Sequence, residues 1–311
     1  MKKLQNILIT GANGQLGMCL REVVHNMQNG NSNGNGRDAQ LCVSTVFFTD
    51  IEELDITDIF AVSSFVHKNK IDCIINTAAY TAVDKAESEP EKAFMINGDG
   101  VWILSHVCRE QNVFLIHIST DYVFDGTATK PYKTNARMNP VSVYGQSKLA
   151  GENFVKESQI PSVIIRTSWL YSQYGHNFMN TMLRLGKEKA TLNVVDDQWG
   201  APTNAHDLAA AILQIMEQAA KITKPTIFHY ANEGVTTWCG FAREIMKIAQ
   251  LLCAVQPIST AQYPTPAARP AYSVFNLSKI KTQLNIKIPS WEESLRRELS
   301  LKFKVQGSKI Q

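Results

Sequence analysis

The chain has 311 residues, 44% of them hydrophobic, and a formal net charge of +3. This length suits one large α/β domain or a domain with a smaller companion. The basic residues are dispersed, without an aromatic-interleaved stripe, so the composition does not favour a nucleic-acid partner. No apolar run approaches the roughly 18 residues of a membrane span, and the N-terminus lacks a signal-peptide pattern. We therefore expect a cytoplasmic protein with no membrane or nucleic-acid partner and with reduced cysteines.

A predicted strand at residues 4–10 runs directly into three glycines, Gly11, Gly14 and Gly17. Their spacing is one residue wider at the first gap than the dinucleotide fingerprint Gly-x-Gly-x-x-Gly, but the physical requirements are the same. One glycine allows a tight turn, one lets a pyrophosphate approach the backbone, and one lets the next helix pack closely. The helix expected from Gln15 presents free N–H groups to the anion. The sequence therefore predicts a dinucleotide-binding turn.

Beyond this turn, apolar strands alternate with helical segments, after a polar Asn- and Gly-rich loop at 28–38. Strands are expected at 42–50, 71–76, 113–120, 162–166, 192–195 and 226–230. Helices are expected at 58–69, 89–111, 177–187, 204–217 and 237–251, around Tyr144, and twice near the C-terminus. Strands that are apolar on both faces and alternate with helices are typical of a covered parallel sheet. The predicted class is α/β, a Rossmann-like doubly wound parallel sheet with a smaller α/β lobe.

Two carboxylates follow the second predicted strand. Asp50 ends that strand, where a carboxylate usually holds the adenosine ribose of a dinucleotide. Asp50 lies further from the glycines than the typical spacing of about 20 residues, and the Asn- and Gly-rich loop accounts for the excess. Asp55 could instead reach the adenine, and either acid could cap the helix that begins near Thr57. The sequence leaves these alternatives open, together with the choice between NADH and NADPH.

Tyr144 and Lys148 are four residues apart and share one face of a predicted helix. The same spacing occurs by chance on amphipathic helices, and the glycine turn is what favours an active site. An ammonium beside a phenol lowers the phenol pKa and makes it a usable general acid. Ser119 and Thr120 end a strand and face opposite ways, so only one hydroxyl can join Tyr144 in a cleft. That hydroxyl would hold a substrate oxygen beside the phenol.

Several longer segments resemble the dTDP-4-dehydrorhamnose reductase family of the extended short-chain dehydrogenase/reductase superfamily. They cover most of the chain, at 81–90, 119–124, 143–152, 166–169, 197–203 and 263–270. The glycine triple and the Tyr-x-x-x-Lys spacing identify only the superfamily, and the other segments are more specific. The resemblance implies NADPH or NADH as cofactor. It also implies reduction of the C4 ketone of a dTDP-linked 4-keto-6-deoxy-L-sugar.

The resemblance further implies roles for individual residues. Thr120, Tyr144 and Lys148 would form the catalytic triad, with Tyr144 protonating the ketone oxygen and Lys148 also holding the nicotinamide ribose. The cofactor would contact Gly11, Asn13, Gly14, Gln15, Leu16, Gly17, Asp50 or Asp55, Ala78, Ala79, Tyr80, Tyr144 and Lys148. The nucleotide sugar would contact Thr81, Asp121, Tyr122, Trp169 and Arg269. In this assignment Arg269 faces the diphosphate, where a fork of donors suits phosphate oxygens. Trp169 could instead be a core ring, and Arg269 an exposed residue of a proline-rich loop.

The resemblance also bears on domains and assembly. Residues 1–166 are expected to form the NAD(P)-binding Rossmann domain, with 196–220 packing back onto it, and 167–311 the smaller substrate-binding lobe. Some members of the family carry a glutamate two residues after the third glycine that is linked to metal-bridged dimers. Cys19 occupies that position here, so no metal site is predicted. The oligomeric state is left open between monomer and homodimer.

Two other functions share this fold. One is a non-catalytic NADP-binding regulatory subunit resembling the β subunit of methionine adenosyltransferase. The other is a different nucleotide-sugar epimerase or dehydratase. The presence of Thr120, Tyr144, Lys148 and Trp169 favours the reductase. A dehydratase would ordinarily have an acid pair after the hydroxyl position, where this chain has Asp121 and Tyr122.

Overall fold

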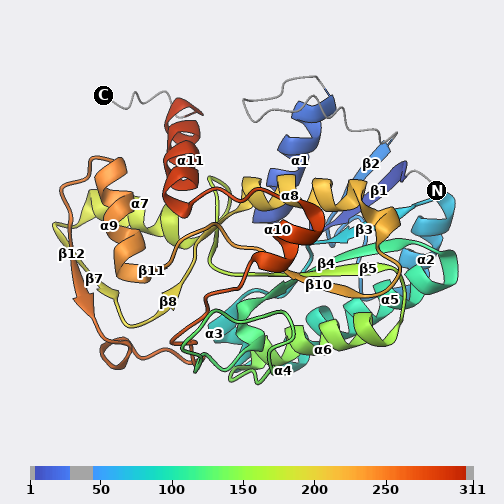
Figure 1. Ribbon diagram of the computed structural model, residues 1–311, viewed down its shortest axis with the longest axis horizontal. Helices are drawn as coiled ribbons and strands as arrows, with labels where there is room; N and C mark the ends of the chain where they lie inside the picture. The colour runs from blue at the N-terminus through green and yellow to red at the C-terminus, as the bar shows by residue number, and fades with distance from the viewer. Residues whose placement is uncertain (1–3, 29–44, 306–311) are drawn as a thin grey trace.

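The computed structural model describes residues 4–28 and 45–305 and is built around a six-stranded sheet (Figure 1). The strands of this sheet are β1 (Asn6–Thr10), β2 (Thr45–Thr49), β3 (Cys73–Asn76), β4 (Phe114–Thr120), β5 (Ser162–Thr167) and β10 (Thr226–His229). Their order is β10-β5-β4-β3-β1-β2, and every neighbouring pair is parallel. The structure confirms the predicted α/β class with a doubly wound parallel sheet.

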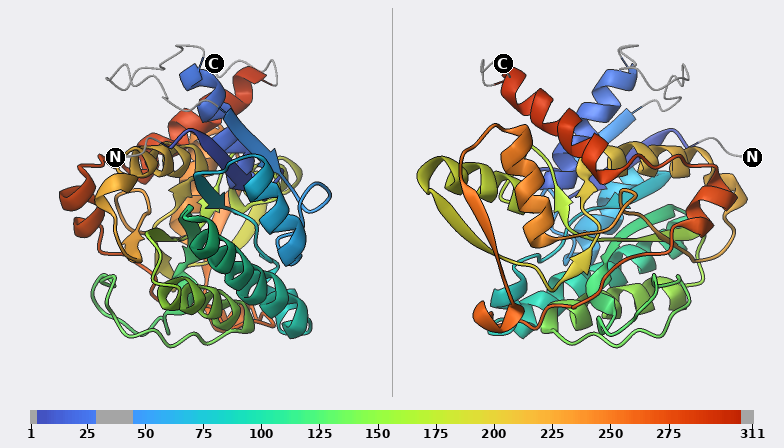
Figure 2. Two further views of the ribbon diagram at one scale, coloured as in Figure 1. Left: turned by 90° about the vertical axis from the view of Figure 1, so that its right-hand side faces the viewer. Right: turned by 60° about the vertical axis from the view of Figure 1, so that its left-hand side comes forward.

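Helices cover both faces of the sheet, because side chains from both faces of its strands are apolar and must be buried. One face packs against α1 (Gln15–Gln28), α8 (Ala205–Glu217) and α10 (Ser278–Leu284). The other face packs against α2 (Ile59–Lys68), α5 (Gly100–Gln111) and α6 (Val143–Glu157). The rotated views show these two layers on opposite sides of the sheet (Figure 2).

Short helical segments connect the larger elements. They are α3 (Val83–Ala86), α4 (Pro90–Phe94), the π-helix η1 (Met95–Asp99), and the 3-10 helices η2 (Asp121–Val123), η3 (Ala219–Lys221) and η4 (Thr260–Gln262). The predicted single helix at 89–111 is therefore three segments, α4, η1 and α5. Within the described ranges, no helix is long and apolar enough to cross a membrane.

A smaller group of elements lies at one end of the sheet and has its own apolar core (Figure 1). Its helices are α7 (Phe178–Glu188), α9 (Trp238–Ile248) and α11 (Trp291–Val305). Its strands β7 (Thr191–Val195) and β12 (Ala254–Ile258) pair in parallel. The short pairs are β6 (Leu170–Tyr171) with β9 (Thr203–Asn204), and β8 (Trp199–Gly200) with β11 (Thr236–Thr237).

The chain passes between the two parts more than once. Strand β10 belongs to the large sheet, although its residues fall within the range 167–311 assigned to the smaller lobe. Helix α8 packs against α1 on the large sheet, where the sequence places segment 196–220. The division into two domains stays a prediction. The predicted loop at 28–38, apart from Gln28, and residues 42–44 of the predicted second strand lie outside the described residues.

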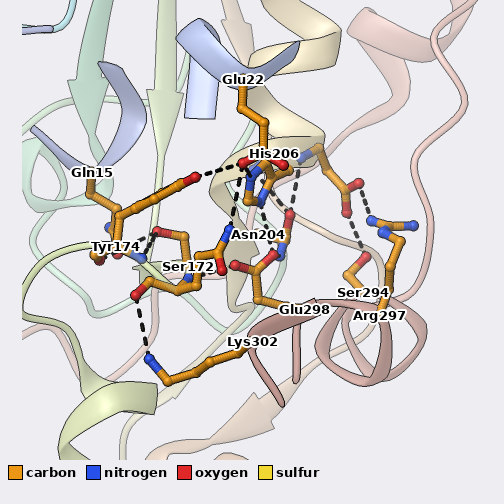
Figure 3. A network of polar contacts seen from close by, with 12 residues as sticks. Gln15, Glu22, Ser172, Tyr174, Asn204, His206, Ser294, Arg297, Glu298 and Lys302 are labelled. Atoms are coloured by element: carbon orange, nitrogen blue, oxygen red, sulfur yellow. Dashed lines mark hydrogen bonds and ion pairs between the residues drawn. The ribbon is translucent and has the colours of Figure 1, made fainter. Parts of the chain in front are cut away.

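A polar network joins the two parts at the N-terminal half of α1 (Figure 3). His206 on α8 lies between two carboxylates, 3.0 Å from Glu22 on α1 and 2.9 Å from Glu298 on α11. Burial by itself would lower the pKa of His206, but hydrogen bonds to Cys19, Glu22 and Glu298 outweigh it and raise the pKa to about 12. The ring is therefore an imidazolium that donates from both nitrogens. Gln15, at the start of α1, accepts a hydrogen bond from Asn177 in the same network.

We expect His206→Gln to destabilise the fold most between about pH 4.5 and 6.5. The pKa of His206 is raised above its ordinary 6.5, so its stabilisation is complete below that value and is lost as the pH rises. The pKa of Glu298 lies below its ordinary 4.5, because the bond to His206 outweighs burial, so its stabilisation is lost as the pH falls. Urea unfolding of wild type and variant from below pH 4.5 to well above pH 6.5 measures the difference. An equal difference at every pH would contradict the imidazolium assignment.

Candidate active site

The glycine turn lies where β1 and β3 meet at their carboxyl ends. Gly11 has a φ of +67°, and a Cβ there would lie 2.6 Å from the Ala78 backbone. A Cβ on Gly17 would lie 2.5 Å from the Gly11 carbonyl oxygen. Strand β1 lies between β2 and β3, so the order of the strands in the sheet reverses there. Ligands bind at the carboxyl ends of the strands beside such a switch point. The glycines, the N-terminus of α1 and the small Ala78 therefore fit a dinucleotide whose pyrophosphate approaches the backbone closely.

The two candidate adenosine carboxylates have different surroundings. Asp50 accepts a hydrogen bond of 2.9 Å from the Asn13 backbone N–H, so it lies at the glycine turn itself. Asp55 accepts from the N–H and hydroxyl of Thr57 at 2.8 and 2.7 Å. Asp58, rather than either of them, caps α2. These positions favour Asp50 over Asp55 as the adenosine contact, which stays a prediction.

The loop after β3 is fixed to the glycine turn through side-chain hydrogen bonds. Asn76 accepts from the Thr10 hydroxyl at 2.8 Å and from the Ala78 N–H at 3.1 Å. Thr77 donates to the carbonyl oxygen of Thr10 at 2.6 Å. These bonds hold Ala78 beside Gly11, in the crevice where the cofactor is expected.

Asn97 is a site residue that the sequence did not indicate. It lies in the π-helix η1, is 1% exposed, and accepts from the Tyr80 N–H at 2.9 Å. Its amide donates to the Tyr80 carbonyl and to Ser147 on α6, both at 3.0 Å. Asn97 thus ties the loop after β3 to the helix that carries Tyr144. The Tyr80 ring is buried and its hydroxyl donates to Glu89. The contact of Tyr80 with the cofactor stays a prediction.

The structure distinguishes the two hydroxyls at the end of β4. Ser119 is buried and donates to Glu152 at 2.6 Å, about two helical turns along α6 from Tyr144. The Thr120 hydroxyl lies close enough to the Tyr144 phenol to lower its pKa in part. Thr120 also donates to the Asp121 carboxylate at 3.0 Å. Thr120 is therefore the hydroxyl that joins Tyr144, which is the assignment that the family resemblance implied.

The pKa of the Tyr144 phenol is raised, whereas the sequence predicts a lowered value. Burial raises the pKa of Tyr144 to about 12, and Thr120 offsets only part of that effect. The Lys148 ammonium is directed at strand β4, where it donates to the Ile118 carbonyl at 2.7 Å. Burial lowers the pKa of Lys148 to about 8, although Glu152 acts in the opposite direction. A phenol with a raised pKa still carries its proton at neutral pH, which is the form a proton donor needs.

Two of the predicted substrate residues, Asp121 and Tyr122, adjoin this triad. Asp121 is 3% exposed and burial raises its pKa to about 6. The Tyr122 ring meets the Tyr144 ring edge-on, 5.5 Å between centroids. Trp169 is partly exposed and stacks on Trp238 with centroids 3.7 Å apart. Thr81 is exposed.

Arg269 does not point freely into solvent. Its guanidinium pairs with both oxygens of Asp84 at 2.9 and 2.8 Å and also donates to the Ala267 carbonyl and the Thr265 hydroxyl. Burial raises the pKa of Tyr122, and the positive charge of Arg269 offsets part of that effect. Arg269 therefore lies near the predicted sugar site. Its contact with a diphosphate stays a prediction. In the part of the chain that the structure describes, no group of three or more His, Cys, Asp or Glu residues could hold a metal ion.

Comparison with known proteins identifies the family. The family model described as RmlD substrate binding domain matches residues 5–302. A dTDP-4-dehydrorhamnose reductase of Sinorhizobium fredii is 44% identical over 243 residues, or 76% of this chain and 82% of the relative. That of Aggregatibacter actinomycetemcomitans is 38% identical over 301 residues, or 94% and 98%. The crystal structure of the Bacillus anthracis enzyme in complex with NADP has a TM-score of 0.84 and 38% identity, covering 96% of this chain and 99% of that one. The chain therefore belongs to the dTDP-4-dehydrorhamnose reductase family.

Proposed function

We propose that the protein reduces the C4 ketone of dTDP-4-dehydro-6-deoxy-L-mannose, dTDP-4-dehydrorhamnose, to dTDP-L-rhamnose with NADPH or NADH. The observation that carries the proposal is the grouping of Thr120, Tyr144 and Lys148 at the same sheet edge as the glycine turn. Relatives that match nearly the whole chain bear the name of this reductase. The NADP bound to the Bacillus anthracis enzyme supports a nicotinamide dinucleotide as the cofactor here.

The residues of the triad have distinct tasks in this reaction. The cofactor, when bound, supplies hydride to C4 of the sugar. Tyr144 gives its phenolic proton to the C4 oxygen as that oxygen gains negative charge. Thr120, whose hydroxyl lies beside the phenol, holds the ketone oxygen in reach of it. The buried Lys148 ammonium stabilises the phenolate that remains after the transfer.

The reductase assignment is tested by supplying the substrate directly. The 4-keto sugar nucleotide is made enzymatically from dTDP-glucose, and the loss of reduced nicotinamide absorbance is followed with each cofactor. We expect substrate-dependent oxidation of NADPH or NADH. A protein that binds the cofactor but oxidises neither form would instead be the non-catalytic regulatory subunit. The oligomeric state, monomer or homodimer, stays a prediction that sedimentation would decide.

We expect Arg269→Lys to raise KM for the nucleotide sugar about ten-fold with little change in kcat. Lysine keeps the charge but loses the planar fork that suits a diphosphate. The matched control is Asp84→Asn, which removes the partner of Arg269 in the same ion pair and leaves the guanidinium in place. Steady-state kinetics measure KM and kcat separately for each variant. If both variants raise KM equally, the ion pair shapes the loop and Arg269 does not bind phosphate.

A further inference from the structure

Helix α6 presents three chemically active side chains on one face. Tyr144, Lys148 and Glu152 follow one another at four-residue steps, which makes each the neighbour of the next on a helix. Lys148 is 3% exposed and Glu152 is 0% exposed. The face of α6 that carries the proposed proton donor therefore continues into a buried ammonium and a buried carboxylate.

The Glu152 carboxylate is fixed from two strands. Arg166 on β5 donates to its two oxygens at 2.8 and 2.7 Å, and Ser119 on β4 donates to one of them at 2.6 Å. Arg166 is itself fully buried, donates to the Thr134 carbonyl at 3.2 Å, and lies over the Phe124 ring. Two parallel bonds to a carboxylate hold both its position and its orientation. Glu152 can therefore neither rotate away from Lys148 nor reach water.

Stability alone does not account for this ion pair. Taking two charges out of water costs several kcal/mol per ion, and apolar residues of similar volume often replace such a pair without loss. The pair does, however, place a fixed negative charge one helical turn from Lys148. Burial lowers the pKa of Lys148 to about 8, and Glu152 opposes that effect. Without the carboxylate, Lys148 would lose its proton closer to neutral pH.

We propose that Glu152 is a positioning residue for the reduction, whose carboxylate, held by Arg166 and Ser119 one helical turn from Lys148, keeps the Lys148 ammonium in its contact with β4. This inference rests on the proposed function and deepens it. The other titratable groups around Lys148 and Glu152 are Tyr144 and Lys156 on α6, His117 on β4, Asp121 just after β4, and Arg166 on β5. Burial and the Lys148 charge hold the pKa of His117 well below its ordinary value, so that ring is neutral.

The charge of Lys148 can be measured without turnover. The Cε resonances of 13C-labelled lysines in the full chain, without cofactor, are followed through a pH titration, and the Lys148 signal is assigned by its loss in Lys148→Arg. In the wild type we expect a midpoint at about pH 8. In Glu152→Gln, which keeps the shape but not the charge, we expect a midpoint about one pH unit lower. The alkaline limb of kcat should move in the same direction.

The matched control is Glu298→Gln, the same substitution at a carboxylate that is 1% exposed and bonded to His206 in the network of Figure 3. Its Lys148 midpoint should equal that of the wild type despite lost stability. If Glu152→Gln does not fold, Glu152→Gln combined with Arg166→Met removes the unpaired cation and should also lower the midpoint. An unchanged midpoint in the Glu152 variants, or an equal shift in Glu298→Gln, would overturn the inference. A wild type without turnover would instead overturn the proposed function.

Discussion

Replacing Tyr144 with phenylalanine is expected to lower kcat by about 100- to 10,000-fold, the range typical of a lost general acid. The Tyr144 hydroxyl lies beside Thr120, so its removal deletes the proton donor and leaves the half-buried ring in place. The glycine turn and the Ala78 loop are untouched by the change, so the Kd for NADPH should stay at its wild-type value. Single-turnover kinetics and cofactor titration measure the two quantities.

The control for this variant is Tyr132→Phe. That hydroxyl is also largely buried, and it donates to Asp125 at 2.8 Å away from the triad. Its loss should cost about 1 kcal/mol of stability, as for a typical hydrogen bond, without a large change in turnover. Normal turnover of Tyr144→Phe would refute the role of the phenol. Equal losses in both variants would mean that the assay reports stability and not proton transfer.

Gly11→Ala is expected to lower cofactor affinity by about 10- to 100-fold and to destabilise the fold by about 1–3 kcal/mol. An alanine Cβ would lie 2.6 Å from the Ala78 backbone, and neither segment can yield because Thr77 and Asn76 bind them together. The turn would therefore open at the point where the pyrophosphate must approach. Isothermal titration with NADPH and urea unfolding measure the two effects.

Gly175→Ala separates this steric effect from backbone strain. Gly175 also has a positive φ, +64°, but the nearest atom to an added Cβ is 4.0 Å away. This variant should lose a similar strain energy and keep its cofactor affinity. If Gly11→Ala binds NADPH as tightly as Gly175→Ala does, the glycine turn is not the cofactor site.

Local patterns in the sequence were sufficient to predict most of the large sheet and the shared helix face of Tyr144 and Lys148, whereas the choice of Thr120 over Ser119 came from the family resemblance. Strand β4 is apolar along its length and ends in Ser119 and Thr120, and the i, i+4 spacing places Tyr144 and Lys148 on one face of α6. The alternation of apolar strands and helices was enough to predict α/β class. Strand β12 was missed because it is short and contains Pro257, which is rare inside strands.

Features that depend on tertiary packing could not be predicted in this way. The π-helix that carries Asn97 departs from the 3.6-residue period on which helix prediction relies. The sequence pattern therefore predicts one continuous helix at 89–111 and does not indicate the π-helix. The pKa of Tyr144 rises because the fold buries the phenol and places Asp121 near it, and spacing along the helix contains neither fact. Likewise, the pairing of Arg269 with Asp84 joins residues far apart in sequence.

Hydride transfer from C4 of the nicotinamide to C4 of the sugar is the central claim, and isotope transfer tests it most directly. The enzyme is supplied with NADPH deuterated at the transferred position and with the 4-keto sugar nucleotide, and the product is examined by proton NMR and mass spectrometry. The account predicts one deuterium, located at C4 of a 6-deoxy sugar whose C4 now bears a hydroxyl. Product without deuterium, or deuterium at another carbon, would contradict it.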